Sequence, residues 1–195
     1  MKDLFIKRFL YYKELGDKTF AQLSDEQLFW QYNEESNSIA IIVNHIAGNM
    51  LSRWTNFLTE DGEKDWRNRD AEFVNSFSTK TDVLEFWEKG WNCLLDALDQ
   101  ITNDNIHATI YIRSEAHSIL DAVLRQLAHY PYHIGQIIYI AKMLKNDDWK
   151  TLSIARNKSA EFNHKMHSKF DSSQENSSSV CFAKSDEVRE DYKPE

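Results

Sequence analysis

A chain of 195 residues is long enough for one domain with its own hydrophobic core. With only 5 Gly and 2 Pro, it has too few turn-forming residues for a many-stranded β protein, and its apolar residues recur at helical spacing. The 31 acidic and 23 basic side chains give a net charge of −8 without a basic cluster that could follow a phosphate backbone. We therefore expect an all-α protein that does not bind nucleic acid.

The sequence also argues against export and membrane insertion. No window reaches the roughly 18 apolar residues of a spanning helix, and the first residues lack the uninterrupted apolar stretch of a secretory leader. Cys93 lies in a helical pattern and Cys181 in a polar segment, so the two do not form a disulfide framework. We expect a cytoplasmic protein that does not bind membranes.

The first half of the chain predicts two helices and a long loop. Apolar residues on one face predict a first helix over 2–23, and Ser38 is a candidate N-cap for a second helix that runs to about Leu58. Residues 59–78 have no sustained period. They are expected to form a loop that borders a site and is pinned by its aromatic residues, Trp66, Phe73 and Phe77.

The second half predicts two more helices. A Thr-x-x-Asp motif from Thr79 resembles a capping box and opens a third helix over about 83–98. Residues 106–113 alternate apolar and polar side chains, which favours one short strand or an extended crossover. Ser118 begins the same Ser-x-x-Asp cap for a fourth helix that ends near Leu144.

The C-terminal residues 168–195 are rich in Ser and Glu and contain few apolar residues. Such a segment buries too little surface to offset its ordering entropy, so we expect it to be disordered or weakly docked. The predicted domain covers residues 1–167.

Two histidines in the fourth helix point to metal binding. His129 and His133 are four residues apart, so they lie about 40° apart around the helix and roughly 6 Å apart along it. Neutral imidazoles bind divalent transition metals, but two seldom complete a site. His45 in the second helix is the best candidate for a third ligand, although all three could instead be ordinary core residues.

The residues around these histidines predict a pocket. Gly48, Asn49 and Ser52 share the face of His45, where small or polar side chains leave room for a ligand. Tyr130 and Gln136 are candidate substrate-orienting groups on the fourth helix. Pro131, between the two histidines, either bends this helix or divides it into two, and the sequence does not decide between these alternatives.

Three phrases of the chain, SIAIIVNHIAGNMLSRW, ILDAVLRQLAHYPYHIGQIIYIAKML and LSIARNKSAEFN, are similar to an uncharacterised bacterial branch of the DinB/YfiT-like metalloprotein superfamily. The resemblance covers about residues 1–166. It implies an up-down-down-up four-helix bundle with a long crossover, commonly a homodimer, in which His45, His129 and His133 hold a divalent metal. We expect Zn²⁺ or Ni²⁺.

The resemblance implies several activities, because family members include S-transferases that use low-molecular-weight thiols, a maleylpyruvate isomerase and a hydrolase. Three imidazoles would leave an open position that activates a thiol or a water. We favour thiol transfer to a small-molecule substrate over hydrolysis, with the thiol supplied from outside, since neither cysteine resembles an activated one. The alternative is a non-catalytic, stress-associated dimer whose metal is structural and has a fourth protein ligand. No residue stands out as a general base.

Overall fold

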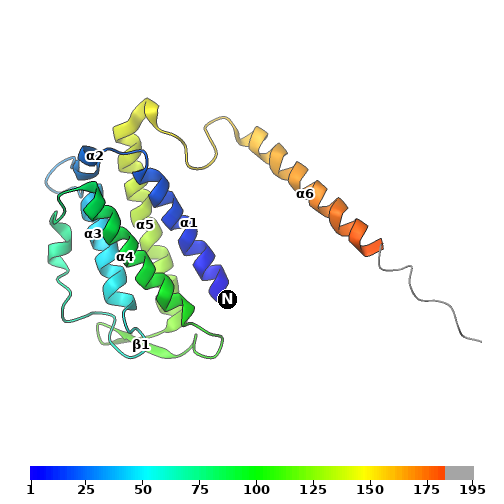
Figure 1. Cartoon of the computed structure of the whole chain (residues 1–195). Coiled ribbons are helices and arrows are strands. Elements are labelled where there is room, and N and C mark those ends of the chain that lie inside the picture. Colours follow the sequence, from blue (N-terminus) through cyan, green and yellow to red (C-terminus); the bar gives the residue numbers. More distant parts are fainter. Residues whose placement is uncertain (183–195) are drawn as a thin grey trace, which may run out of the picture. The chain divides into compact units, whose positions relative to one another are not determined.

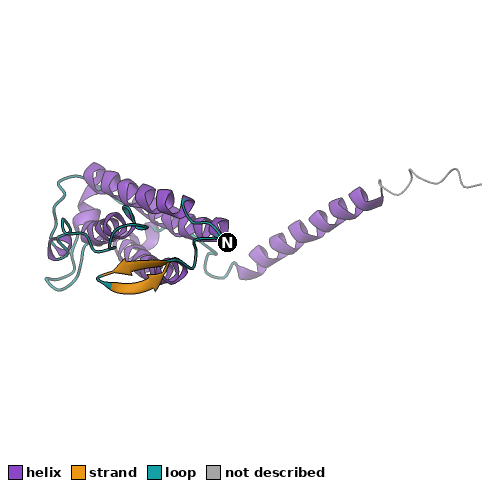
Figure 2. Cartoon of the chain, turned by 90° about the horizontal axis from the view of Figure 1, so that it is seen from below, coloured by secondary structure: helices purple, strands orange, loops and turns teal. Residues whose placement is uncertain are grey.

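A computed structural model describes the backbone of residues 1–182 and the side chains of residues 1–170. The chain is mostly helical, as predicted, with a small two-stranded sheet (Figures 1 and 2). The elements are α1 (Lys2–Phe20), α2 (Asp25–Phe29), α3 (Ile39–Trp54), η1 (Asp70–Phe73), α4 (Lys80–Asp99), β1 (Thr109–Ile112), β2 (Glu115–Ser118), α5 (Ile119–Lys145), η2 (Asn146–Asp148) and α6 (Ser159–Phe182). The chain divides into two units, Met1–Lys150 and Thr151–Glu195.

The four long helices of the first unit pack side by side (Figure 1). Helix α1 contacts α4 and α5, and α3 contacts the same two helices. Large aromatic side chains fill the space between them, with Trp54, Trp87, Trp91 and Tyr130 each no more than 2% exposed. Burial of such side chains is the main stabilising contribution to the fold, at about 25 cal/mol per Å² of apolar surface.

The predicted helix starts are confirmed. Ser38 Oγ accepts a hydrogen bond from Ile41 N at 3.2 Å at the start of α3, and Ser118 Oγ accepts from Asp121 N at 3.1 Å at the start of α5. Thr79 and Asp82 form a complete capping box for α4. Each cap satisfies a backbone N–H that the first helical turn leaves unpaired.

The observed helices differ from the sequence prediction in two respects. Helix α3 ends at Trp54 and not near Leu58, because Thr55 is extended and Asn56 has a φ of 48°, which the helix cannot continue through. The short helix α2 was not predicted, although Ser24 begins a capping box there. Helix α5 is continuous through Pro131, so the fourth predicted helix is not divided.

The region predicted as one short strand is a β-hairpin. Strands β1 and β2 pair antiparallel, with Thr109 opposite Ser118 and Ile112 opposite Glu115. Arg113 and Ser114 form the turn, with φ values of 56° and 64°. The second strand escaped prediction because Glu115–Ser118 has neither alternating polarity nor β-branched residues.

Helix α6 spans residue 168, where the predicted Ser- and Glu-rich C-terminal segment begins. It runs from Ser159 to Phe182, so residue 168 lies inside a helix. The segment has no Gly or Pro to end a helix. Every residue from 159 to 170 is exposed. The expected disorder of residues 183–195 lies outside the described residues.

Candidate metal centre

The three predicted histidines come together between α3 and α5. Their potential ligand nitrogens all lie within 4.8 Å of one another, and the Nε2 atoms of His129 and His133 are 3.0 Å apart. The ring of His45 lies with its centroid 5.4 Å from that of His129 and 4.9 Å from that of His133. A tetrahedral ion with N bonds of about 2.0–2.1 Å holds its ligands about 3.4 Å apart, so shifts of about 1 Å would complete the site.

Each imidazole is oriented by a hydrogen bond from its Nδ1 atom. The acceptors are Glu72 Oε2 for His45 (2.9 Å), Gln126 Oε1 for His129 (3.3 Å) and Gln136 Oε1 for His133 (2.8 Å). Because carboxylate and amide oxygens only accept, each Nδ1 donates in these hydrogen bonds. The neutral rings of His129 and His133 then present an unprotonated Nε2, which is the tautomer a metal ligand requires.

Burial keeps the imidazoles of His129 and His133 uncharged at neutral pH. Burial, followed by the neighbouring His133 and His45 rings, lowers the pKa of His129 from 6.5 to about 4. Burial also lowers the pKa of His133, and its hydrogen bond to Gln136 only partly opposes the effect. Protons therefore compete little with a metal ion for these two nitrogens.

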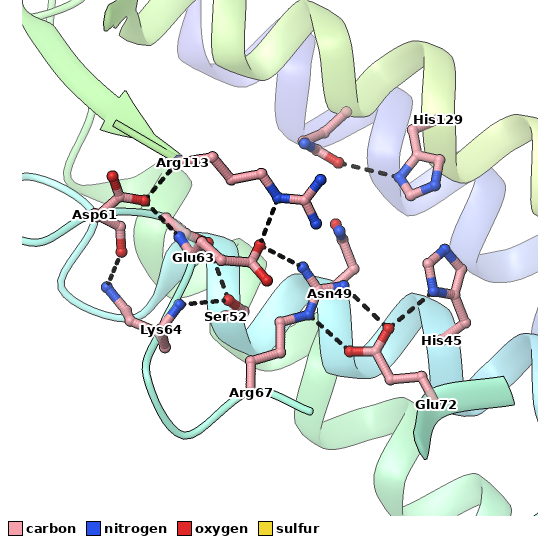
Figure 3. A network of polar contacts seen from close by, with 12 residues as sticks. His45, Asn49, Ser52, Asp61, Glu63, Lys64, Arg67, Glu72, Arg113 and His129 are labelled. Carbon is pink, nitrogen blue, oxygen red and sulfur yellow. Dashed lines mark hydrogen bonds and ion pairs between the residues drawn. The ribbon is translucent and has the colours of Figure 1, made fainter. Parts of the chain in front are cut away.

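Glu72 is a part of the site that the sequence analysis missed. It lies in η1, within the loop of residues 59–78, and is 7% exposed. Arg67 donates to both of its oxygens, from Nε to Oε1 at 2.7 Å and from Nη2 to Oε2 at 3.0 Å (Figure 3). Burial alone would raise the pKa of Glu72, but the hydrogen bonds from His45 and Arg67 outweigh it and lower the pKa. A charged carboxylate therefore orients His45.

The sequence predicts that Gly48 leaves room for a ligand, but in the structure it makes room for the Glu72 carboxylate. A Cβ at Gly48 would lie 2.7 Å from Glu72 Oε1, so the space beside His45 is taken by the Glu72 carboxylate and not by a ligand. The ring of Phe73 also stacks on His45, with centroids 4.8 Å apart. The loop thus covers one side of the His45 ring.

Ion pairs hold this loop as much as aromatic residues do. Phe77 packs on Phe86, with centroids 5.7 Å apart, but Trp66 is 61% exposed and does not pin the loop as expected. Glu63 pairs with Arg67 at 2.9 Å and with Arg113 of the hairpin turn at 3.2 Å (Figure 3). This network links the loop to the hairpin, and both border the histidines.

The four predicted pocket residues take different places. Asn49 lines a cavity of about 250 Å³ together with His45 and His129. Tyr130 is fully buried and donates from its hydroxyl to Asn49 Oδ1 at 3.1 Å, so it orients that amide. Ser52 is buried and anchors the loop, donating to the carbonyl of Gly62 and accepting from Lys64 N. Gln136 orients His133 and lines a separate groove.

Across the described residues, no other group of three His, Cys, Asp or Glu side chains is placed to hold a metal ion. In the same part of the chain, no helix is both long and apolar enough to cross a membrane.

Comparisons with known proteins identify the family. Residues 2–158 match the family described as "Protein of unknown function (DUF1572)". No curated protein matches the chain. Among solved structures, the chain is similar to a DinB-like protein from Bacillus cereus ATCC 10987, with a TM-score of 0.54 and 17% identity over 72% of this chain and 90% of that one. The similarity supports the DinB-like fold that the resemblance of the three sequence phrases implied. The chain belongs to the DUF1572 family of proteins of unknown function, and its fold is DinB-like.

Proposed function

We propose that this chain is a metal-dependent thiol S-transferase, in which His45, His129 and His133 hold one divalent ion, Zn²⁺ or Ni²⁺. The observation that carries the proposal is the Nε2 pair of His129 and His133, 3.0 Å apart with both Nδ1 atoms facing amide oxygens. Two unprotonated nitrogens at that distance repel each other unless a cation lies near both. The low pKa of His129 disfavours a proton in this role, and a metal ion suits it.

The set of ligands leaves room for chemistry. No fourth His, Cys, Asp or Glu of the described chain joins the three histidines, and Glu72 is engaged by His45 and Arg67. When bound, the ion would stabilise a thiol as its thiolate at neutral pH. A small-molecule electrophile would enter through the adjacent cavity, where the amide of Asn49, oriented by Tyr130, is available to position it.

The lining of the cavity supports thiol transfer over hydrolysis. No carboxylate lines this cavity in the described structure, so no general base would assist the ion in activating water for hydrolysis. A thiolate attacks without a further base. The thiol would come from a low-molecular-weight co-substrate, because burial raises the pKa of Cys93 and its Sγ lies beside the Thr55 hydroxyl, away from the histidines.

The remaining alternatives are a metal-dependent hydrolase and a non-catalytic, stress-associated protein whose ion is structural. Cobalt(II)-substituted protein distinguishes an open coordination position from a closed one. With an open position, 2-mercaptoethanol should produce thiolate-to-cobalt charge-transfer absorption, whereas ethylene glycol should not. A cobalt spectrum that 2-mercaptoethanol leaves unchanged would contradict a thiol-activating role and favour a closed, structural site.

We also propose that α1, α3, α4 and α5 form an up-down-down-up four-helix bundle that assembles as a cytoplasmic homodimer. The support for a dimer is an apolar stripe on one face of α5, where Tyr132, Tyr139 and Met143 are 62%, 66% and 48% exposed. Sedimentation velocity tests this arrangement. A Tyr139→Lys variant should sediment as a monomer, and a monomeric wild-type protein at micromolar concentration would contradict the proposal.

A further inference from the structure

The cavity beside the histidines is strongly basic. It has a volume of about 250 Å³ and is lined by His45, Asn49, Gln126 and His129 together with five arginines from four segments. These are Arg53 of α3, Arg67 and Arg69 of the loop, Arg113 of the hairpin turn and Arg125 of α5. This concentration of positive charge is unexpected in a chain whose net charge is −8.

Only two of the five arginines are neutralised. Arg67 pairs with Glu72 and Glu63, and Arg113 shares Glu63 at 3.2 Å. Among the described residues, no carboxylate lies within ion-pair distance of the other three guanidinium groups, those of Arg53, Arg69 and Arg125. Arg69 instead lies over the ring of Phe73, 5.1 Å from its centroid. About three positive charges thus remain without a partner around one small space.

Arg53 is the most informative of these residues. It is 4% exposed, and its Nε and Nη1 atoms are buried without a hydrogen-bond partner in the described chain. Along α3 it follows His45 and Asn49 at intervals of four residues, so all three side chains share one face of the helix. A buried guanidinium without an acceptor is strongly unfavourable, and an anionic ligand would remove that cost.

We propose that this cavity binds a small organic dianion, with one of its anionic groups held by Arg53. Guanidinium groups bind carboxylate and phosphate groups through paired hydrogen bonds, so both a dicarboxylate and a phosphate monoester would suit this cavity. The volume of about 250 Å³ accommodates roughly eight water molecules at about 30 Å³ each, and therefore a ligand of roughly eight to ten non-hydrogen atoms.

This ligand would lie beside the imidazoles, because His45 and His129 line the same cavity. The idea that the small dianion is the substrate rests on the proposed metal-dependent function. The idea that Arg53 binds an anion is independent of that function, since none of the arginines is a metal ligand in that proposal. The two ideas can therefore be tested separately.

The test is calorimetric titration of metal-stripped full-length protein with succinate, a dicarboxylate, and with glycerol 3-phosphate, a phosphomonoester. We expect saturable binding of at least one, and the stronger of the two identifies the anionic group. Acetate, with one charge, should bind at least about tenfold more weakly. An Arg53→Gln variant should lose about ten- to hundredfold in affinity, the range expected for a charged hydrogen-bonded pair.

Two controls separate loss of the anion site from loss of the fold or of the metal site. Arg8 is an exposed arginine of α1, and Arg8→Gln, which removes the same charge, should bind within about twofold of wild type. Arg53→Gln should melt at or above the wild-type temperature, because it removes an unpartnered buried charge. A His133→Ala variant should lose metal binding and keep dianion binding. Absence of saturable binding to both ligands, or equal affinity in Arg53→Gln and wild type, would overturn the proposal.

Discussion

Replacing Glu72 by Gln should weaken both the metal site and the fold. In the native structure its Oε2 accepts from His45 Nδ1 at 2.9 Å and from Arg67 Nη2 at 3.0 Å, while Oε1 accepts from Arg67 Nε at 2.7 Å. An amide of the same size has one oxygen, so at least one of these three donors must face an NH₂ group. The side chain of Arg67 is only 2% exposed, and it would keep Glu63 as its one carboxylate partner.

The magnitude follows from these contacts. Removing one partner of a buried ion pair costs about 3–5 kcal/mol, and the remaining Glu63 pair should reduce the loss in free energy of unfolding to about 2–4 kcal/mol. Loss of the carboxylate that orients a histidine ligand typically lowers metal affinity about 10- to 100-fold. Urea unfolding of metal-free protein measures the first effect, and competitive titration with Zn²⁺ measures the second.

A matched control is Glu115→Gln, because the Glu115 side chain is 74% exposed and should change stability by less than about 0.5 kcal/mol. If Glu72→Gln matched this control in both stability and zinc affinity, the reasoning that Glu72 orients His45 would be refuted.

Three further predictions concern the same region. Gly48→Ala should lower zinc affinity about 10-fold or more, because the added Cβ would displace the Glu72 carboxylate from His45. Competitive titration measures the effect, and an unchanged affinity would show that Gly48 is not needed to place Glu72 beside His45. Three imidazoles with the ordinary pKa of 6.5 would lose about a thousandfold in metal affinity between pH 7.5 and 5.5. Because burial lowers the pKa values of His129 and His133, the loss measured by titration at both pH values should be far smaller, and a loss of about a thousandfold would contradict this. Cys93 should react with a thiol-specific reagent at pH 7 more slowly than a free thiol, because burial raises its pKa. Rapid reaction in the native state would show that this thiol is activated. Cys93→Ala should retain metal binding.

The sequence was most informative where a local pattern determines the structure. The caps at Ser38, Thr79 and Ser118 depend on residues three apart, and the pair His129 and His133 depends on helical spacing alone. Such features involve neighbours along the chain, and the structure contains all of them.

The features of the site that the sequence does not predict are contacts between segments that are distant in sequence. Glu72 is 27 residues from His45 and lies in an irregular loop, so no periodicity relates the two. The arginines of the cavity come from two helices, a loop and a hairpin turn. Their convergence depends on the packing of those elements, which a single sequence does not specify. The sequence shows that Gly48 is small, but it does not show that the Glu72 carboxylate occupies the space beside it.

Calorimetric titration of untagged, metal-stripped protein with Zn²⁺ tests the three-histidine metal site most directly. We expect one ion per chain, and we expect His45→Ala, His129→Ala and His133→Ala each to abolish this binding event. The exposed His107 serves as the control, and His107→Ala should leave the titration unchanged. Absence of binding in the wild type, or binding that survives all three substitutions, would contradict the assignment of a metal site to these histidines.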